Sequence, residues 1–242
     1  MILISGDFHA NSRNELELIT KSSLKKHYGP AFKTIQYHII LGDAGFLWPG
    51  NDKTDLYNAK ILAARPFKTL FLGGNHEPIY GRDLKEFEQI DLGFGHPVYK
   101  IYEDFDVYYL ERGFSYDIEN KHLLVLGGAL SIDKAFRREN ISWWPGEYWT
   151  PQEEERCLEL LKTDNRFDYV LSHTGPNFIC KQLLSVSESA GRKLKDKVAI
   201  FNEDIDNCIS FGKWLFGHWH FDRICSLSDK TYQCLYKTTL LI

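Results

Sequence analysis

The sequence predicts an α/β protein in which mixed β-sheets are flanked by helices. Short apolar runs, with the length and residue types of buried strands, recur along all 242 residues. Helical patterns lie between the early runs, and this alternation is typical of parallel strands in one sheet. In the middle of the chain, strands instead follow one another across tight polar turns, as they do in antiparallel hairpins. The sheets should therefore be mixed.

Five predicted strands end directly before a polar cluster. The strands cover residues 1–5, 37–41, 69–72, 169–171 and 214–216. Because the carboxyl ends of parallel strands meet at one edge of a sheet, the polar side chains are expected to converge there. The clusters are Gly6-Asp7-Phe8-His9, Gly42-Asp43, Gly74-Asn75-His76-Glu77, Ser172-His173 and Gly217-His218-Trp219-His220.

Helices are predicted over residues 15–27, 54–64 and 82–90, of which the first stops at Gly29-Pro30. Another begins at Thr150-Pro151-Gln152-Glu153, a capping box with proline at the first helical position. A further helix should run from about residue 202 to 211.

Strands are predicted over residues 107–110, 115–118 and 122–126, joined by polar turns such as Glu119-Asn120. The tail should close as a hairpin of residues 223–227 and 232–240.

Composition indicates one compact domain over residues 1–242. The chain is 43% hydrophobic and 26% charged, and no repeat or linker divides it. A substrate-side loop or cap insertion is expected at about residues 128–150. The net charge of −4 argues against a protein that holds nucleic acid by broad phosphate neutralisation.

Cysteine usage indicates a reducing compartment. The five cysteines are odd in number and form no CxxC pair, so neither structural disulfides nor a thiolate zinc site is expected. There is no apolar stretch of membrane-spanning length and no basic leader followed by an apolar core. We expect a cytoplasmic protein that does not contact a membrane.

The polar clusters contain the nitrogen and oxygen donors that bind hard and borderline metal ions. Asp7 and His9 are separated by one residue, so on an extended segment both would point the same way while Phe8 faces the core. His218 and His220 repeat this spacing. Asp43 could bridge two cations about 3.5–4 Å apart. The adjacent side chains of Asn75 and His76 should diverge.

The ordered set resembles the calcineurin-like metallophosphoesterase superfamily, including its small bacterial and phage-type members, in the blocks GDxH, GD, GNH(E/D), a strand-end His, and GHxH. The match spans residues 6–220. The resemblance implies a four-layer αββα sandwich with two divalent metal ions, and it makes His76 a proton donor or transition-state stabiliser. It implies one metal held by Asp7, His9, Asp43 and His220, and a second held by Asp43, Asn75, His173 and His218.

The expected function is a dinuclear phosphoesterase in which a metal-bridging hydroxide attacks phosphorus while His76 acts as general acid. Mn²⁺ is expected because the ligands lack sulfur, with Fe²⁺ or Zn²⁺ as alternatives. Phosphodiesters are favoured because Phe46 and Leu47 occupy the Asp and Arg positions of the protein-phosphatase pattern GDxVDRG. A phosphomonoesterase acting on nucleotides or phosphoproteins is the alternative. A binding scaffold of the same fold without turnover is an alternative of another class.

Substrate contacts are expected from Asn75 and from Arg137 and Arg138, because Arg holds phosphate oxygens bidentately. Three tryptophans that follow (Trp143, Trp144 and Trp149) could stack on a base, although packing is the favoured interpretation. The substrate would be a phosphate ester, with nucleotides and nucleic acids among the candidates, and no obligate protein partner is inferred. The basic residues 192–197 are interpreted as an exposed loop.

Overall fold

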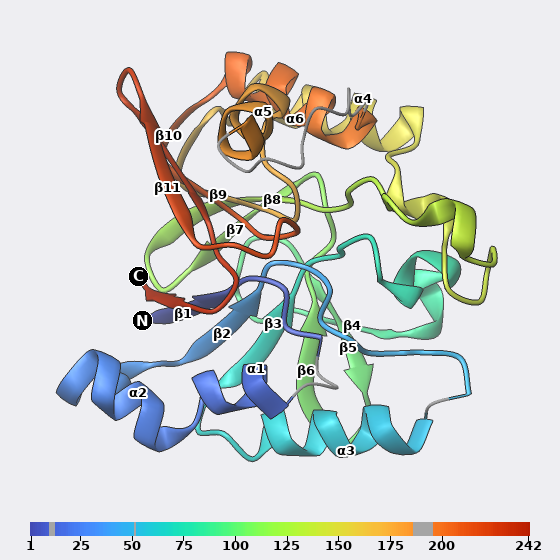
Figure 1. The fold of residues 1–242 in the computed structure, drawn as a ribbon. Coiled ribbons are helices and arrows are strands. Elements are labelled where there is room, and N and C mark those ends of the chain that lie inside the picture. The colour runs from blue at the N-terminus through green and yellow to red at the C-terminus, as the bar shows by residue number, and fades with distance from the viewer. Residues whose placement is uncertain (10–12, 51, 186–195) are drawn as a thin grey trace.

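The computed structural model of the protein describes residues 1–9, 13–50, 52–185 and 196–242. Two mixed β-sheets pack face to face, and helices cover both outer faces (Figure 1). This is the predicted αββα sandwich. Of the basic residues 192–197 interpreted above as a loop, 192–195 lie outside the described part of the chain, whereas Lys197 begins a helix capped by Asp196.

The first sheet contains seven strands among the described residues, in the order β13-β1-β2-β3-β6-β5-β4. Strands β1, β2 and β3 are parallel, as the early strand–helix alternation predicts. The strand predicted over residues 107–110 does not form a hairpin with 115–118, because β6 instead pairs parallel with β3 in the first sheet. The bounds are β1 (Ile2–Ser5), β2 (Tyr37–Ile40), β3 (Lys68–Phe71), β4 (Glu88–Ile90), β5 (Val98–Tyr102), β6 (Phe105–Tyr109) and β13 (Thr239–Leu241).

The second sheet contains six described strands, in the order β11-β12-β10-β9-β8-β7. Strands β8, β9, β10 and β12 are parallel, and β7 and β8 form the predicted hairpin. Its turn residues Glu119 and Asn120 have φ values of 52° and 59°, the left-handed conformation of tight hairpin turns. The bounds are β7 (Phe114–Ile118), β8 (Lys121–Leu126), β9 (Arg166–Ser172), β10 (Ser210–Phe216), β11 (Arg223–Leu227) and β12 (Lys230–Cys234).

Helices lie on opposite sides of the sheet pair (Figure 1). Helices α1 (Arg13–Leu18), α2 (Lys21–Tyr28) and α3 (Asp52–Ala63) cover the first sheet. Helices α4 (Pro151–Leu161), α5 (Asn177–Ser185) and α6 (Lys197–Cys208) cover the second. Short 3-10 turns join the layers: η1 (Gly29–Thr34), η2 (Pro78–Gly81), η3 (Leu84–Glu86), η4 (Lys134–Phe136) and η5 (Pro145–Glu147).

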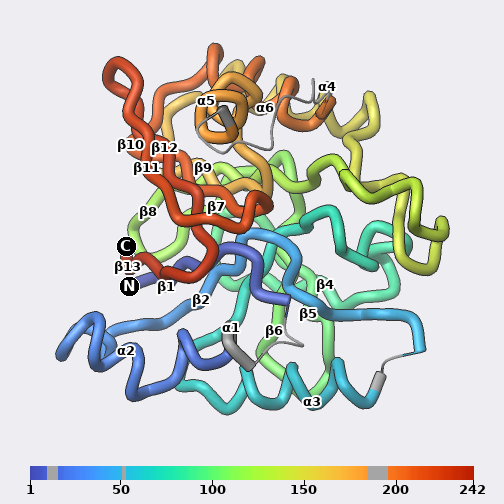
Figure 2. The backbone as a smooth tube through the Cα atoms, viewed as in Figure 1, coloured from blue at the N-terminus to red at the C-terminus, as the bar shows by residue number. Residues whose placement is uncertain are grey.

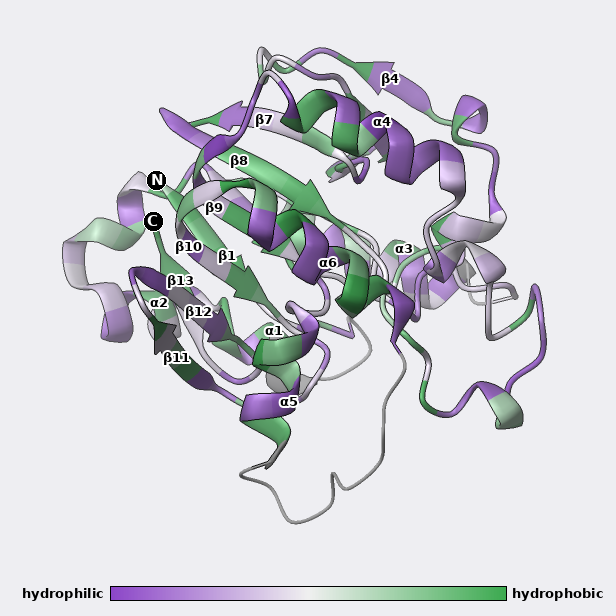
Figure 3. Ribbon diagram, turned by 90° about the horizontal axis from the view of Figure 1, so that it is seen from above, coloured by the Kyte–Doolittle hydropathy of each residue, from purple (hydrophilic) through white to green (hydrophobic). Residues whose placement is uncertain are grey.

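Three apolar clusters fill the spaces between the four layers. Strand alternation assigns each side chain to a layer: Ile2 and Ile4 join the cluster between the sheets, while Leu3 packs against the helices of the first sheet. The inner strands are correspondingly apolar, whereas α4 carries hydrophilic residues (Figure 3). Burial on both faces makes the sheet pair a rigid support for the loops at its edge.

The two described chain ends lie side by side, because β13 pairs antiparallel with β1 (Figure 2). The tail hairpin prediction was therefore only partly correct. Strands β11 and β12 pair as expected, but residues 239–241 leave that sheet and complete the first one. The sequence does not show which sheet residues 239–241 join, because a short apolar strand can pair with the edge of either sheet.

Three helix predictions need correction. Residues 82–90 form a 3-10 turn and strand β4, since Asp83 caps a single turn and residues 88–90 pair with β5. The helix expected over 15–27 is two helices, because Thr20 caps the second one. The helix expected over 202–211 begins at Lys197 after the cap residue Asp196, and Phe211 already belongs to β10.

Candidate metal centre

Polar side chains from both sheets meet at one edge of the sandwich. Strands β1, β2 and β3 of the first sheet lead into Asp7, Asp43 and Asn75-His76, and strands β9 and β10 of the second lead into His173 and His218-Trp219-His220. A cavity of about 470 Å³ opens there. It is lined by His9, Asp43, Asn75, His76, Ile132, Asp133, Arg137, His218, Trp219 and His220.

Two groups of side chains have the spacing of a metal site. Asp7, His9 and His220 form one group, and Asp7, Asp43 and His173 form the other, with ligand atoms within 4.8 Å of one another in each. Asp7 is common to both groups. Asp43, a member of the second group, lies 3.5 Å from His173 Nε2 in its own group and 3.9 Å from His9 Nε2 in the first.

Asn75 adds its amide oxygen to the second group. Its Oδ1 lies 3.0 Å from His173 Nε2 and 2.9 Å from His218 Nδ1. His173 Nδ1 donates to the carbonyl of Leu41 at 2.7 Å and lies 3.6 Å from Asp7 Oδ1, while Nε2 lies 3.5 Å from Asp43 Oδ2. A backbone partner on the other ring nitrogen is the usual way in which a metal-binding histidine is oriented.

The electrostatics of the buried carboxylates favour a cation. Asp7 and Asp43 are 1% and 2% exposed. Burial would raise their pKa values, but the hydrogen bond from His220 to Asp7 and the charge of His173 beside Asp43 outweigh it, so both pKa values are lowered. Burial likewise would lower the pKa of His173, yet Asp43 raises it to about 9.

The donor set therefore fits divalent metal ions. A protonated His173 compensates only one of the two buried carboxylate charges, and cation binding commonly displaces such a proton. His218 Nε2 is buried and has no hydrogen-bond partner among the described residues, so this nitrogen is also available as a ligand. Burial and the charge of His173 lower the pKa of His218 to about 3, which keeps its ring neutral.

His76 contacts an arginine, whereas the recorded side-chain partners of Asn75 are His173, His218 and Ser131. Arg137 Nη2 lies 2.8 Å from His76 Nε2. The same guanidinium is clamped by Asp133 through two hydrogen bonds of 2.6 and 2.7 Å and donates to the carbonyl of Ser142. Because a guanidinium only donates, Nε2 is an acceptor here. Burial, together with the charge of Arg137, lowers the pKa of His76.

A buried polar network orients Asn75. Its Nδ2 donates to Ser131 Oγ at 3.2 Å, and that hydroxyl donates to Glu147 at 2.5 Å. Glu147 is fully buried, and it also accepts from the Ser131 backbone N–H. Sequence reasoning did not assign a role to either residue. The available signal was that both polar residues lie within the expected insertion at about residues 128–150.

Glycines of the sequence motifs pack against the ligands of neighbouring motifs. A Cβ on Gly42 would lie 2.4 Å from the His173 ring, and one on Gly74 would lie 2.2 Å from Asp43 Oδ1. A Cβ on Gly217 would lie 2.6 Å from Asp7 Oδ1. Each ligand is thus held by a glycine from a different loop. The glycines are required by close approach.

The one-residue spacing of Asp7 and His9 and of His218 and His220 predicted extended segments. The backbone is not extended there. His9, Asp43, His218 and His220 have φ values of 38°, 49°, 69° and 51°, in the left-handed region. The chain turns sharply because backbone groups bind neighbouring motifs: His9 N–H donates to the Asp43 carbonyl, and His218 N–H donates to Asp7 Oδ1, both at 2.7 Å. Non-glycine residues with this backbone strain concentrate at functional sites.

The aromatic residues between these ligands do face inward. Phe8 is 1% exposed within the helix-side cluster, and Trp219 packs against the cluster below the second sheet. Glu77, which follows His76, is buried and accepts from the Ala44 N–H, so it supports the loop after Asp43. Burial and the nearby charge of Asp43 raise its pKa well above the usual range.

The two arginine candidates differ in position. Arg137 lines the cavity, whereas Arg138 is exposed and is not among the lining residues. Trp143, Trp144 and Trp149 are 6%, 3% and 8% exposed, as the packing interpretation predicts. Trp149 donates to the Gly127 carbonyl, and Lys134 lies over the Trp143 ring.

Comparison with known proteins gives one family match. The model of the calcineurin-like phosphoesterase family matches residues 1–222, most of the chain and all of the polar clusters. No curated protein matches the sequence. Among the described residues, none of the helices has the length and apolar character needed to cross a bilayer.

Proposed function

Because this chain belongs to the calcineurin-like phosphoesterase family of metal-dependent hydrolases, we propose that it hydrolyses phosphodiester bonds with two divalent metal ions. The observation that carries the proposal is the convergence of buried carboxylate, imidazole and amide donors from five strand ends of two sheets. Side chains that only stabilise the fold would not need to gather two buried carboxylates and several imidazoles in one place. Such convergence is what a dinuclear site needs.

We assign Asp7, His9, Asp43 and His220 to one cation, and Asp43, Asn75, His173 and His218 to the other, with Asp43 as the bridge. When bound, the cations would neutralise phosphate oxygens and activate water. The donor set contains nitrogen and oxygen only, which supports Mn²⁺ as the native metal, with Fe²⁺ or Zn²⁺ as alternatives. The Asp43 carboxylate has histidines on both sides, and this supports its bridging role.

His76 is the proposed general acid, and Arg137 is the proposed phosphate ligand. Arg137 donates to His76 Nε2, and while it does so that atom cannot donate. A phosphate oxygen offers Arg137 a stronger, charged acceptor. Arg137 then turns to the substrate, and His76 Nε2 becomes free to hold the proton that the leaving oxygen takes. Asp133 keeps the guanidinium at the cavity in both positions.

Diesters are favoured over monoesters by the second cluster. Phe46, at the position of the protein-phosphatase Asp, is fully buried in the helix-side apolar cluster. Leu47, at the position of the Arg, adds no charge near the phosphate. Fewer fixed positive charges suit a diester, which carries one negative charge less than a monoester. The alternative is a phosphomonoesterase acting on nucleotides or phosphoproteins.

We further propose that residues 1–242 form one domain and that residues of about 128–150 are its substrate-side cap. The contact of Arg137 with His76 and the link from Glu147 through Ser131 to Asn75 support this assignment. A catalytically silent scaffold is the competing class, but binding alone gives no reason for the arrangement of His76 and Arg137.

The proposal is tested with metal-free protein reconstituted with Mn²⁺. Turnover of bis-p-nitrophenyl phosphate and p-nitrophenyl phosphate is measured for the wild type, Asp43→Asn and His76→Ala. We expect metal-dependent turnover with the diester preferred, loss of turnover in Asp43→Asn, and a kcat lower by about 10²–10⁴-fold in His76→Ala.

Absence of turnover on both substrates, with two metal ions shown bound, would establish the scaffold instead. Faster cleavage of the monoester would reverse the proposed order of the two activities. Circular dichroism of each variant separates loss of chemistry from loss of fold.

A further inference from the structure

His220 is the most exposed of the residues assigned to the two cations. Its side chain is 52% exposed, whereas the side chains of Asp7 and His173 are fully buried. Packing fixes the buried ligands, but an exposed ring keeps rotamer freedom that metal binding must remove. The 2.9 Å contact of its Nε2 with Asp7 Oδ2 holds one edge of the ring and leaves the plane of the ring to be set by a second contact.

That second contact is a stacked tyrosine. The ring centroids of His220 and Tyr236 lie 4.7 Å apart, and the two planes are inclined by only 9°. Overlap of the two faces sets the plane of the imidazole without covering the edge that faces Asp7. Tyr236 lies beyond residues 1–222, which the family model matches, so the family motifs do not include it.

Tyr236 belongs to a segment that is anchored on both sheets. We call residues 235–238 the crossover segment, because they join β12 of the second sheet to β13 of the first (Figure 2). Leu235 N–H donates to the carbonyl of Phe216 at 2.8 Å, at the end of β10. A Cβ on Gly6 would lie 1.9 Å from the carbonyl oxygen of Leu235, so the crossover segment touches the backbone directly before Asp7.

Asp222 ties the crossover segment to the loop that carries His220. Its carboxylate accepts from the backbone N–H groups of Tyr236, Lys237 and Thr238 at 2.9, 3.0 and 3.2 Å. It also accepts from the Thr238 hydroxyl. Because Asp222 follows His220 by two residues, these bonds fix the stacked ring relative to the ligand itself.

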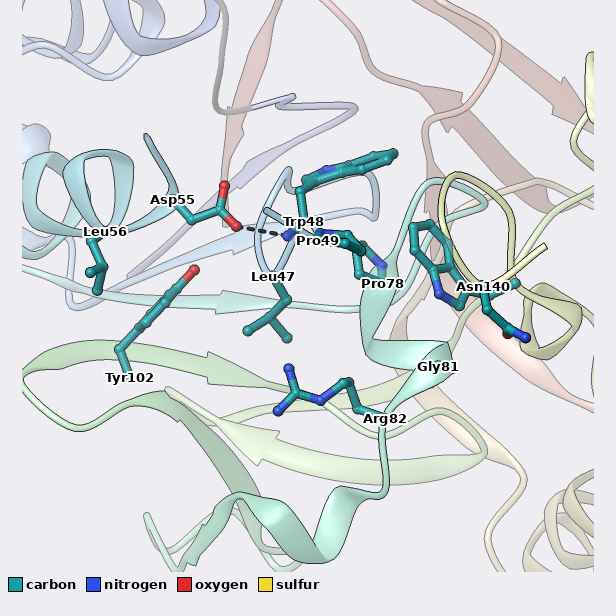
Figure 4. Close-up of a pocket in the computed structure, with 11 residues that line it drawn as sticks. Leu47, Trp48, Pro49, Asp55, Leu56, Pro78, Gly81, Arg82, Tyr102 and Asn140 are labelled. Atoms are coloured by element: carbon teal, nitrogen blue, oxygen red, sulfur yellow. Dashed lines mark hydrogen bonds between the residues drawn. The ribbon is translucent and has the colours of Figure 1, made fainter. Parts of the chain in front are cut away.

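Carboxylates hold the loop after β2 in the same way. Asp55 accepts from the Trp48 N–H at 2.7 Å, as Figure 4 shows, and Glu77 accepts from the Ala44 N–H. That loop contains Asp43. Bonds from a carboxylate to backbone N–H groups thus orient a ligand loop of each sheet, and Asp222 extends this support to the C-terminal segment.

A stacked phenol ring favours the metal-bound form of an imidazole. An imidazole that binds a cation loses electron density to it, and the negative face of an aromatic ring attracts an electron-poor partner. The stack also restricts the imidazole before the cation arrives, so less conformational entropy is lost on binding. Both effects need the ring of Tyr236, whereas neither needs its hydroxyl group.

We propose that Tyr236 is a positioning residue of the metal centre, which holds His220 in the plane required for its cation. Asp222 in turn holds Tyr236. This inference rests on the proposed two-metal function and adds the C-terminal segment to the centre. Loss of the ring should weaken the cation that His220 binds and spare the cation that His173 binds.

The test titrates Mn²⁺ into the metal-free protein by calorimetry and follows each addition by electron paramagnetic resonance. Two bridged Mn²⁺ ions give an exchange-coupled spectrum and an isolated ion an uncoupled one, so the two binding steps are distinguished. Tyr236→Leu should weaken one ion by about tenfold, the upper value for one aromatic pair, and the other by less than about twofold. Tyr236→Phe should keep the wild-type affinities, because it keeps the ring.

Tyr28→Leu is the matched control. The Tyr28 hydroxyl contacts Thr239 Oγ1 at 2.6 Å, so this variant removes a tyrosine that holds the same C-terminal tail. Among the described residues, the recorded contacts of Tyr28 do not include a metal ligand. Both ions should therefore bind to Tyr28→Leu as they do to the wild type.

Nuclear magnetic resonance of the metal-free protein tests the stack apart from the metal. A ring-current shift of the His220 Cε1 proton is expected in the wild type and in Tyr236→Phe, and it should disappear in Tyr236→Leu. Asp222→Ala should reduce the shift and weaken the same ion as Tyr236→Leu. Because Asp222 is exposed, this variant decides by the same criterion if Tyr236→Leu does not fold.

The outcomes separate the positioning role from the proposed function. Unchanged affinities in Tyr236→Leu would overturn the proposal, as would a loss of equal size in Tyr28→Leu or in Tyr236→Phe. If the wild type binds two Mn²⁺ ions without turnover of any phosphate ester, the proposed function fails while the titrations still decide the role of Tyr236. A wild type that binds fewer than two ions would reject both.

Discussion

Glu147 is fully buried and reaches the metal centre only through two other residues. It accepts the Ser131 hydroxyl proton, so that hydroxyl oxygen must accept in turn from Asn75 Nδ2. The amide of Asn75 is thereby fixed with Oδ1 toward His173 and His218. Orientation of a metal ligand by such outer contacts affects affinity strongly.

Ser131→Ala should weaken metal binding by about 10–100-fold at the Asn75 side, because the amide loses its orientation. Competition of a chelator with Mn²⁺ measures the affinity. Ser142→Ala is the matched control, since its hydroxyl contacts only the backbone of Arg138 among the recorded hydrogen bonds. Equal affinities in the two variants would refute the network.

Arg137 and Arg138 are adjacent, but they should behave differently. Arg137→Met should raise KM by about tenfold or more, because a charge-assisted bidentate contact with phosphate is lost. Arg138→Met should leave KM within about twofold, because Arg138 is exposed outside the cavity. Steady-state kinetics on the diester decides between them, and equal effects would reject the assignment of Arg137.

The sequence could predict the ligand types but not the outer contacts. Asp7, Asp43 and the histidines are recognisable because their residue types and strand-end positions recur. Ser131 and Glu147 are not, since each is ordinary in isolation and their contact with Asn75 depends on tertiary packing.

At the scale of elements, the strand-end loops interlock through glycine. Gly42 combines a φ of 85° with a Cβ position 2.4 Å from the His173 ring. Gly50 has a similar φ of 72° but nothing within 4 Å. An alanine at either position strains the backbone, but only an alanine at Gly42 also displaces His173.

Gly42→Ala should abolish turnover and metal binding, whereas Gly50→Ala should cost only the left-handed backbone penalty of about 1–2 kcal/mol and keep activity. Chemical denaturation gives the free energy of unfolding, and the Mn²⁺ titration gives the binding. Retained metal affinity in Gly42→Ala would contradict the interlocking.

His122 links the β7–β8 hairpin to the turn before β9. Its Nδ1 lies 2.7 Å from Asp117 and its Nε2 lies 2.9 Å from Asp164. Burial would lower its pKa, but the hydrogen bonds to these carboxylates raise it. A raised pKa in the folded state stabilises the fold below the unfolded pKa of about 6.5, and the effect is lost as the pH rises through the folded value.

His122→Gln should therefore reduce the free energy of unfolding more at about pH 5.5 than at about pH 8.5. Urea denaturation at the two pH values measures the difference. Because the histidine is 31% exposed, the effect should be modest. A pH-independent loss would show that the contacts do not depend on the charge of the ring.

Elements with strong local signals were predicted well. The capping box at Thr150 begins α4 as expected, and the parallel strands lie where apolar runs end in polar clusters. The helix predicted over residues 82–90 does not form, because β4 is stabilised by pairing with β5. Local sequence periodicity does not reveal this contact. Helix α5 was missed, although it follows the fourth cluster directly.

At the scale of the molecule, the proposed metal centre spans the two sheets. Asp7, Asp43 and Asn75 come from the first sheet, and His173 and His218 come from the second. Bound cations should therefore join the halves of the sandwich. The sequence indicates the convergence, but it cannot show that the ligands divide between two sheets.

Metal loading should raise the unfolding temperature of the whole protein. At about 100 times Kd, binding adds about 2.7 kcal/mol, and a protein of this size gains about 2–4 °C per kcal/mol. Differential scanning fluorimetry with Mn²⁺ and with a chelator measures the shift. Asp43→Asn should lose most of it, and an equal shift in that variant would argue against Asp43 as a shared ligand.

Stability and metal binding favour different residues at four positions with a left-handed backbone: His9, Asp43, His218 and His220. A left-handed backbone at a residue other than glycine costs on the order of 1–3 kcal/mol, so these loops lower the stability of the fold. Glycine at any of the four would relax the backbone and remove a ligand. Selection for thermal stability alone is therefore expected to replace these four residues. Stabilised variants should be tested first for metal binding.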